Sequence, residues 1–147
     1  MLHEELTRTV IGSFLRVYHT IRHGQLEAMY QRALEIELRH AGLSVECEVA
    51  MRVFYRDHSI GDSRMDMIVE DVLLVECKAC DRLVRPHELQ ILNYLNASGI
   101  EIGLLFNFGP QPSIKRFAPS IHRTNHGIFR AVRVAPVHRN RHLPNAP

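Results

Sequence analysis

The sequence predicts an α/β fold in which a mixed β-sheet is flanked by helices, in the order α-α-β-β-β-α-β. Two amphipathic helical stretches come first, and the apolar residues then change to the alternating period of strands. A further helical stretch separates the last two strands, as in a βαβ crossover. The length of 147 residues suits one compact domain, and 46% hydrophobic with 23% charged residues is typical of a globular chain.

Two helices begin the chain. Residues 4–22 carry an apolar stripe at helical spacing, and Gly24 provides a natural end for this helix. A second helix is expected over residues 26–40, ending at Gly42. Both helices have one apolar face, so each is expected to pack against the sheet.

Three strands are predicted next, over residues 45–55, 63–69 and 72–79, with a turn region over 56–61. The last of the three opens with four apolar residues in a row, which predicts a central strand covered on both faces. In the first strand, alternation predicts that four side chains share one face: Val45, Cys47, Val49 and Met51.

The remaining elements complete the crossover. A helix beginning at Pro86 is expected to run to about residue 97, followed by a strand over 101–108 and a short edge strand over 113–117. The helix is expected to bury three side chains: Leu89, Leu92 and Leu95.

Charge is distributed unevenly. Residues 111–147 hold seven of the 18 Lys and Arg and no acid, although the formal net charge of the chain is only +2. We therefore divide the chain into a domain over 1–118 and a basic, Pro-containing tail over 119–147. Such a tail is either a grip for phosphates or a solvated chain end, and the sequence leaves both open. The candidate nucleic-acid contacts are Lys115, Arg116 and Arg123.

Three cysteines and the absence of a secretory-signal pattern predict reduced thiols and a cytoplasmic location. No run of 18 apolar residues predicts a membrane span. Cys77 and Cys80 form a C-x-x-C pair, but Cys77 lies within a predicted strand and no second pair exists. A zinc or redox role is therefore not favoured.

Charged residues interrupt the predicted core strands. Glu76 and Lys78 are two positions apart in a strand and so share a face, while Cys77 points into the opposite layer. Asp66 interrupts the preceding strand. It lies opposite Glu76 only if the loop between the strands has three residues, 70–72, since a two-residue loop would put the two acids on opposite faces. A structural ion pair is the alternative explanation for Glu76 and Lys78.

Two carboxylates and a lysine in this arrangement are suited to phosphate chemistry. Oxygen ligands select a hard cation, here Mg²⁺ or Mn²⁺. The cation neutralises phosphate charge and lowers the pKa of bound water, and the lysine can orient or deprotonate that water. The chain has two lysines against 16 arginines, and Lys78 is one of the two.

The spacing from Asp66 to Glu76-Cys77-Lys78 resembles the PD-(D/E)xK nuclease signature, with Met65 in place of the proline. The stretch from Gly24 to Tyr30 reads G-x-x-E-x-x-Y, which resembles the motif of the GxxExxY protein family within that superfamily. Matching stretches at residues 61–66, 75–79, 87–95 and 103–108 extend the resemblance over about residues 8–117. The resemblance implies a restriction-endonuclease-like fold.

The resemblance also implies roles. Asp66 and Glu76 would ligate the metal, with Glu27 as the helix acid that supports it, and Lys78 would be the catalytic lysine. Gln90 corresponds to the glutamine on the helix that follows. Secondary candidates are Tyr30, for which a packed core tyrosine is the favoured alternative, and His87, which is otherwise a first-turn helix residue.

The predicted function is a metal-dependent phosphodiesterase that hydrolyses nucleic acid to a 5′-phosphate and a 3′-hydroxyl. The predicted substrate is DNA, and RNA is the alternative. One alternative is a catalytically silent module of the same fold that binds nucleic acid or a protein. Another is an interaction protein with acids scattered by chance. The small size predicts a homodimer or a partner that supplies specificity.

Overall fold

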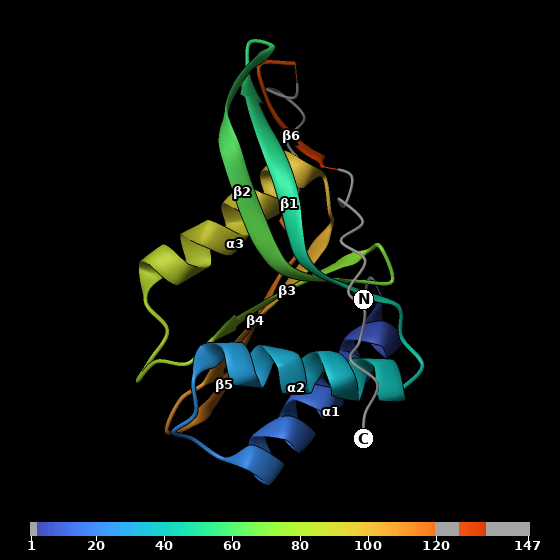
Figure 1. Ribbon diagram of the computed structural model, residues 1–147, viewed down its shortest axis with the longest axis vertical. Coiled ribbons are helices and arrows are strands. Elements are labelled where there is room, and N and C mark those ends of the chain that lie inside the picture. Colours follow the sequence, from blue (N-terminus) through green and yellow to red (C-terminus); the bar gives the residue numbers. More distant parts are fainter. Residues whose placement is uncertain (1–2, 120–126, 135–147) are drawn as a thin grey trace, which may run out of the picture.

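A computed structural model describes residues 3–119 and 127–134, and it confirms the predicted fold class: a mixed sheet between helices (Figure 1). The elements, in chain order, are α1 (Glu4–Ile21), α2 (Glu27–His40), β1 (Val45–Tyr55), β2 (His58–Val69), β3 (Leu73–Lys78), α3 (Arg85–Ser98), β4 (Ile102–Phe108), β5 (Pro112–Phe117) and β6 (Phe129–Arg133).

The sheet has the order β5-β4-β3-β2-β1-β6. Among the strands of the described residues, only β3 and β4 pair in parallel, and α3 connects them, as the crossover prediction requires. Every residue of β4 is buried, and in β3 only Lys78 is partly exposed. Continuous burial on both faces explains the apolar runs of these two central strands.

Helices cover both faces of the sheet. Helices α1 and α2 pack on one face around a core that includes Phe14, Leu34 and Phe106, and α3 packs on the other around Ile91 and Leu95. The predicted buried face of α3 is partly wrong, because Leu89 is 42% exposed. A Cβ at Gly103 on β4 would lie 3.0 Å from side chains of both Ile91 and Leu95, so this glycine lets the helix approach the sheet closely.

The first hairpin changes faces at its middle. Val45 and Cys47 pack with the α1–α2 core, whereas Val49 and Met51 pack with the α3 core, so the prediction that all four share a face is wrong. The physical reason is the backbone of Glu48, whose φ of 54° breaks the alternation of β1. On β2 the change occurs at Asp66, because Met67 faces the α1–α2 core and Met65 the α3 core.

The turn of this hairpin is shorter than predicted. Arg56 and Asp57 have φ of 46° and 66° and form a two-residue turn between the paired residues Tyr55 and His58. Positive φ at both positions matches the twist of a hairpin, so β2 begins at His58 instead of residue 63. The extra residues form a long, exposed hairpin end, at the top of Figure 1.

The register between β2 and β3 is confirmed. Val69 pairs with Leu73 and Met67 with Val75, so three residues, 70–72, form the loop. Continuing this register places Asp66 opposite Glu76 on the same face of the sheet. The sequence-based condition for bringing the two acids together is therefore met.

Part of the predicted tail belongs to the sheet. Strand β6 pairs antiparallel with β1, from Met51–Arg133 to Tyr55–Phe129, and this strand was not expected from the sequence. The boundary between the domain and the tail, at residues 118 and 119, stays a prediction. Strand β6 lies on the tail side of that boundary. In the part of the chain that the structure describes, no helix has the length and apolar character to cross a membrane.

Candidate functional site

The two acids meet where β2 and β3 separate. The backbone pairing of β2 with β3 ends at Met67 and Val75. At the next position, side-chain carboxylates accept the hydrogen bonds of the backbone N–H groups. The carboxylate of Asp66 accepts a hydrogen bond from the backbone N–H of Cys77 at 2.8 Å, and that of Glu76 accepts one from the N–H of Asp66 at 3.1 Å. Each acid is therefore fixed by the backbone of the other's strand, which holds the pair in one orientation.

Burial makes this pair electrostatically unfavourable. Glu76 is 2% exposed, and burial, followed by the nearby charge of Asp66, raises its pKa to about 9. Burial also raises the pKa of Asp66, against the hydrogen bond from Cys77 and the charge of Lys78. A buried and a half-buried carboxylate, both with raised pKa values, form a site that a divalent cation would stabilise in the ionised state.

Lys78 lies on the same face as Glu76 and is held by α3. Its Nζ donates to Oε1 of Gln90 at 2.9 Å, and Nε2 of Gln90 donates to the hydroxyl of Tyr94 at 3.2 Å. The charge of Lys78 opposes the rise in the pKa of Asp66 and of Glu76 but does not cancel it. The structure thus brings together Asp66, Glu76, Lys78 and Gln90, four of the predicted site residues.

Glu27 is the first residue of α2 and is exposed. Burial is the main cause of the raised pKa of Cys77, and the charge of Glu27 adds to it, as it does at Cys80. The carboxylate therefore faces the end of β3, although no hydrogen bond joins it to Asp66 or Glu76.

Two residues beside the acids were not predicted. Gln31 lies one helical turn after Glu27, and its Nε2 donates to Glu48 at 2.8 Å and to the carbonyl oxygen of Asp66 at 3.4 Å. The charge of Glu48 is one of the causes that raise the pKa of Asp66. The i, i+4 spacing from Glu27 is a signal for Gln31, but no sequence signal marks the positive φ of Glu48.

A further unpredicted residue fixes the chain where it leaves β3. Asn107 on β4 is fully buried, and its amide both accepts from the N–H of Cys80 at 3.0 Å and donates to its carbonyl at 2.9 Å. A Cβ at Gly109 would lie 2.3 Å from that carbonyl oxygen, so only glycine fits there. An asparagine in an otherwise apolar strand is the sequence signal for this contact.

The secondary candidates have structural contacts. Tyr30 is fully buried and stacks on Phe108 at 4.4 Å between ring centroids. Its hydroxyl donates to the carbonyl of Arg22 and accepts from the N–H of Gln25, so it fixes the loop that leads to Glu27. The Nδ1 of His87 accepts from the N–H of Val84 and caps α3.

Two of the three predicted nucleic-acid contacts lie on β5, and the third is not among the described residues. Lys115 on β5 forms an ion pair with Glu88 of α3, and Arg116 is its neighbour on the same strand. Arg123 lies outside the described residues.

The two cysteines of the C-x-x-C pair have different surroundings. Cys77 is fully buried on the α1–α2 face, and burial raises the pKa of its thiol well above the ordinary value. Cys80 donates to the carbonyl oxygen of Arg82. Burial and the separation of the two roles leave Cys77 a core residue.

The donor set fits a hard divalent cation. Asp66 and Glu76 supply carboxylate oxygens at one point, and burial raises the pKa of both in spite of the nearby charge of Lys78, so a bound cation would stabilise their ionised state. Within residues 3–119 and 127–134, no group of three or more His, Cys, Asp or Glu side chains is close enough to form a complete ligand set. A cation held here would therefore need further oxygen ligands from water or substrate.

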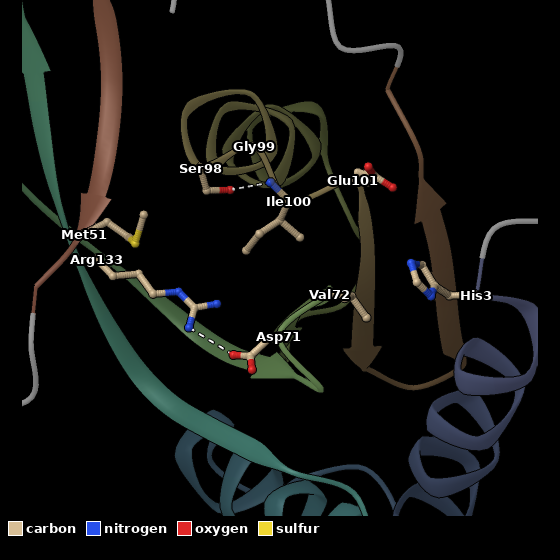
Figure 2. Close-up of a pocket in the computed structure, with 9 residues that line it drawn as sticks. All are labelled: His3, Met51, Asp71, Val72, Ser98, Gly99, Ile100, Glu101 and Arg133. Carbon is tan, nitrogen blue, oxygen red and sulfur yellow. Dashed lines mark hydrogen bonds and ion pairs between the residues drawn. The ribbon is translucent and has the colours of Figure 1, made fainter.

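A cavity of about 440 Å³ lies elsewhere, between the end of α3, the β2–β3 loop and the outer strands (Figure 2). Arg133 and Asp71 form an ion pair across it at 3.2 Å, and Ile100 and Met51 line its apolar side. Among the described residues, none of those predicted for the site lines this cavity, which lies near the start of β4, whereas the acids lie near the end of β3.

The mixed sheet with helices on both faces is the restriction-endonuclease-like α/β fold, and its acids and lysine lie at the end of a central strand. The chain belongs to the PD-(D/E)XK nuclease superfamily, whose family model matches residues 4–117. No curated protein and no solved structure gave a match.

Proposed function

We propose that this protein is a metal-dependent nuclease of the GxxExxY family, which hydrolyses phosphodiester bonds of nucleic acid, with DNA as the proposed substrate, and uses Mg²⁺ or Mn²⁺. The main support is the convergence of Asp66, Glu76 and Lys78 in a chain that belongs to a nuclease superfamily. The proposal also places the protein in the cytoplasm, as a homodimer or with a partner that supplies specificity.

The residues would divide the work as follows. Asp66 and Glu76 would hold the cation, with Glu27 as a further ligand directly or through water. The cation would neutralise phosphate charge and lower the pKa of the attacking water. Lys78, oriented by its hydrogen bond to Gln90, would position that water and accept or share its proton.

The reaction consumes one water for each bond broken. The water oxygen forms a bond to phosphorus, the bond from phosphorus to the 3′ oxygen breaks, and a proton ends on that oxygen. The products are a 5′-phosphate and a 3′-hydroxyl. The burial of Glu76 suits this role, because charge in a site with little water acts more strongly on the transition state.

The test is a cleavage assay on plasmid DNA, linear single-stranded DNA and RNA, with Mg²⁺ or Mn²⁺ or with EDTA. We expect cation-dependent cleavage that falls by about 10² or more in Asp66→Asn and Lys78→Arg, since arginine does not readily give up a proton. Lys115→Arg changes the only other lysine and is the matched control.

Two results would contradict the proposal. Cleavage undiminished in Asp66→Asn would come from a contaminant and not from this site. Nucleic-acid binding without cleavage by the wild type, under every cation tested, would support the silent-module alternative instead.

A further inference from the structure

The outer half of the first hairpin, residues 50–64, and residues 127–134 with β6 together form a three-stranded extension, here called the arm. It reaches beyond α1 and α2 at the top of Figure 1. One face of the arm lies against α3, through Met51, Met65 and Ala131. The opposite, outer face is on the side of the sheet where α1 and α2 pack but lies beyond α2 in Figure 1, and Arg52, Asp62 and Arg64 on it are exposed.

Arginine side chains gather on this outer face. Residues that face each other on paired strands share a side of the sheet. Arg52 of β1 lies opposite Asp62 of β2 and Val132 of β6. On the same side, Phe54 lies opposite Arg130, and Ala50 lies opposite Arg64. The face therefore presents three arginines, Arg52, Arg64 and Arg130, interleaved with Phe54 and Val132. The guanidinium of Arg130 lies 4.3 Å from the centre of the Phe54 ring, which holds it against the surface.

The arm differs in charge from the rest of the described chain. Residues 50–64 and 127–134 hold five arginines and two aspartates. Residues 3–49 and 65–119 hold ten Lys and Arg against 14 Asp and Glu. The arm is therefore a basic surface on an otherwise acidic domain, and it complements a polyanion.

The acidic partners of these arginines can be exchanged for phosphates. Arg52 binds Asp62 at 3.1 Å and Arg130 lies 3.5 Å from Asp57, but the two aspartate side chains are 54% and 83% exposed. Exposed ion pairs of this kind contribute about 0–1 kcal/mol. A phosphate backbone offers the same arginines bidentate partners together with counterion release.

The outer face also leads to the acids. Arg64 is two residues before Asp66, and its guanidinium lies 3.5 Å from the carboxylate of Glu48, which Gln31 ties to Asp66. A backbone lying along Arg130, Arg52 and Arg64 would therefore end beside the site where β2 and β3 separate.

We propose that the outer face of the arm binds the sugar–phosphate backbone of nucleic acid and leads it toward Asp66 and Glu76. This inference rests on the proposed function, because it names the surface by which that site would receive its substrate. It differs from the contacts expected from sequence, since Lys115 is paired with Glu88 and the arm carries the excess positive charge.

The experiment measures binding by fluorescence anisotropy in EDTA, with labelled duplex and single-stranded oligonucleotides, over a range of salt. The test variant is Arg52→Gln with Arg130→Gln, and the control is Arg8→Gln with Arg16→Gln, two exposed arginines of α1 that are also ion-paired. We expect the dissociation constant of the arm variant to rise about tenfold and the magnitude of its salt slope to fall by about two, with no change in the control.

The outcomes separate this inference from the proposed function. If the wild type binds and cleaves while the arm variant binds with unchanged affinity and salt slope, the arm proposal is wrong and the nuclease proposal stands. If the wild type binds neither oligonucleotide, both are wrong. A thermal melt of each variant checks the fold, and the duplex and single-stranded arms of the assay identify which form the face prefers.

Discussion

At the end of β3, Glu76 is 2% exposed and hydrogen-bonded to backbone, whereas on the arm Arg52 and Asp62 are about half exposed and bonded to each other. Both regions hold charged side chains on neighbouring strands of one sheet. Glu76 is shielded from water and the ion pair of the arm is not, so the charges of the arm cost little, whereas ionisation of Glu76 is unfavourable in the absence of a cation. Carboxylates that need a cation suit catalysis, and exposed arginines that can replace an aspartate by a phosphate suit binding.

The comparison predicts the largest effect at Glu76. Its pKa of about 9 lies above the ordinary 4.5, so the unfolded chain loses this proton first and the free energy of unfolding falls as the pH rises from about 5 to 9. At pH 7 the free energy of unfolding is about 3 kcal/mol lower than at acid pH, where Glu76 is protonated in both the folded and the unfolded chain. Glu76→Gln keeps an oxygen for the N–H of Asp66, and we expect it to stabilise the protein and to flatten that pH dependence.

Urea unfolding in EDTA at pH 5, 7 and 8.5 measures this. Asp62→Asn on the arm is the control, with an expected change within about 0.5 kcal/mol, as is usual for exposed positions. A Glu76→Gln variant that is less stable than the wild type at pH 8.5 would mean that Glu76 is not a buried, uncompensated acid.

A smaller effect is expected from the glycines of the two regions. At Gly109 a new Cβ would meet the carbonyl of Cys80 at 2.3 Å, whereas at Gly127, beside β6, nothing lies within 4 Å. We expect Gly109→Ala to cost about 1–3 kcal/mol by overpacking and Gly127→Ala to cost much less. Thermal melts of both variants measure the difference. Equal melting temperatures would show that the chain after β3 is not held as tightly as its contacts indicate.

The smallest effect tests whether the tightly held region includes α2. Gln31 joins the helix that carries Glu27 to the strand that carries Asp66. We expect Gln31→Ala to weaken Mn²⁺ binding about tenfold, since partners of metal ligands have effects of this size. Electron paramagnetic resonance of free Mn²⁺ measures it, with Asn96→Ala, an exposed amide on α3, as the control. Unchanged affinity would place Gln31 outside the site.

Much of the fold follows from local patterns. The helices α1 and α2, the covered strand β3 and the crossover through α3 to β4 were predicted, because apolar periodicity and helix ends are properties of short stretches. The register of Asp66 and Glu76 was given as a condition on the loop length, and the structure meets it. The side that α3 buries was partly wrong, because the close approach at Gly103 selects Ile91 and Leu95.

Other features depend on contacts between distant residues. The change of faces at Glu48 interrupts an alternation that the sequence continues without a break, so no local pattern could reveal it. Strand β6 was assigned to the tail because a basic, Pro-containing segment reads as irregular, and only its pairing with β1 makes it part of the sheet. The clamp from Asn107 to Cys80 joins residues 27 positions apart.

The charged side chains within the core strands could be identified from residue order, because a carboxylate or lysine stands out among apolar neighbours. The folded chain was needed to show that Asp66 and Glu76 bond to each other's strands, that Gln90 reaches Lys78 from α3, and that the arginines of three strands form one face. Those are distances between segments far apart in the chain, set by the twist and separation of the sheet, which residue order alone does not specify.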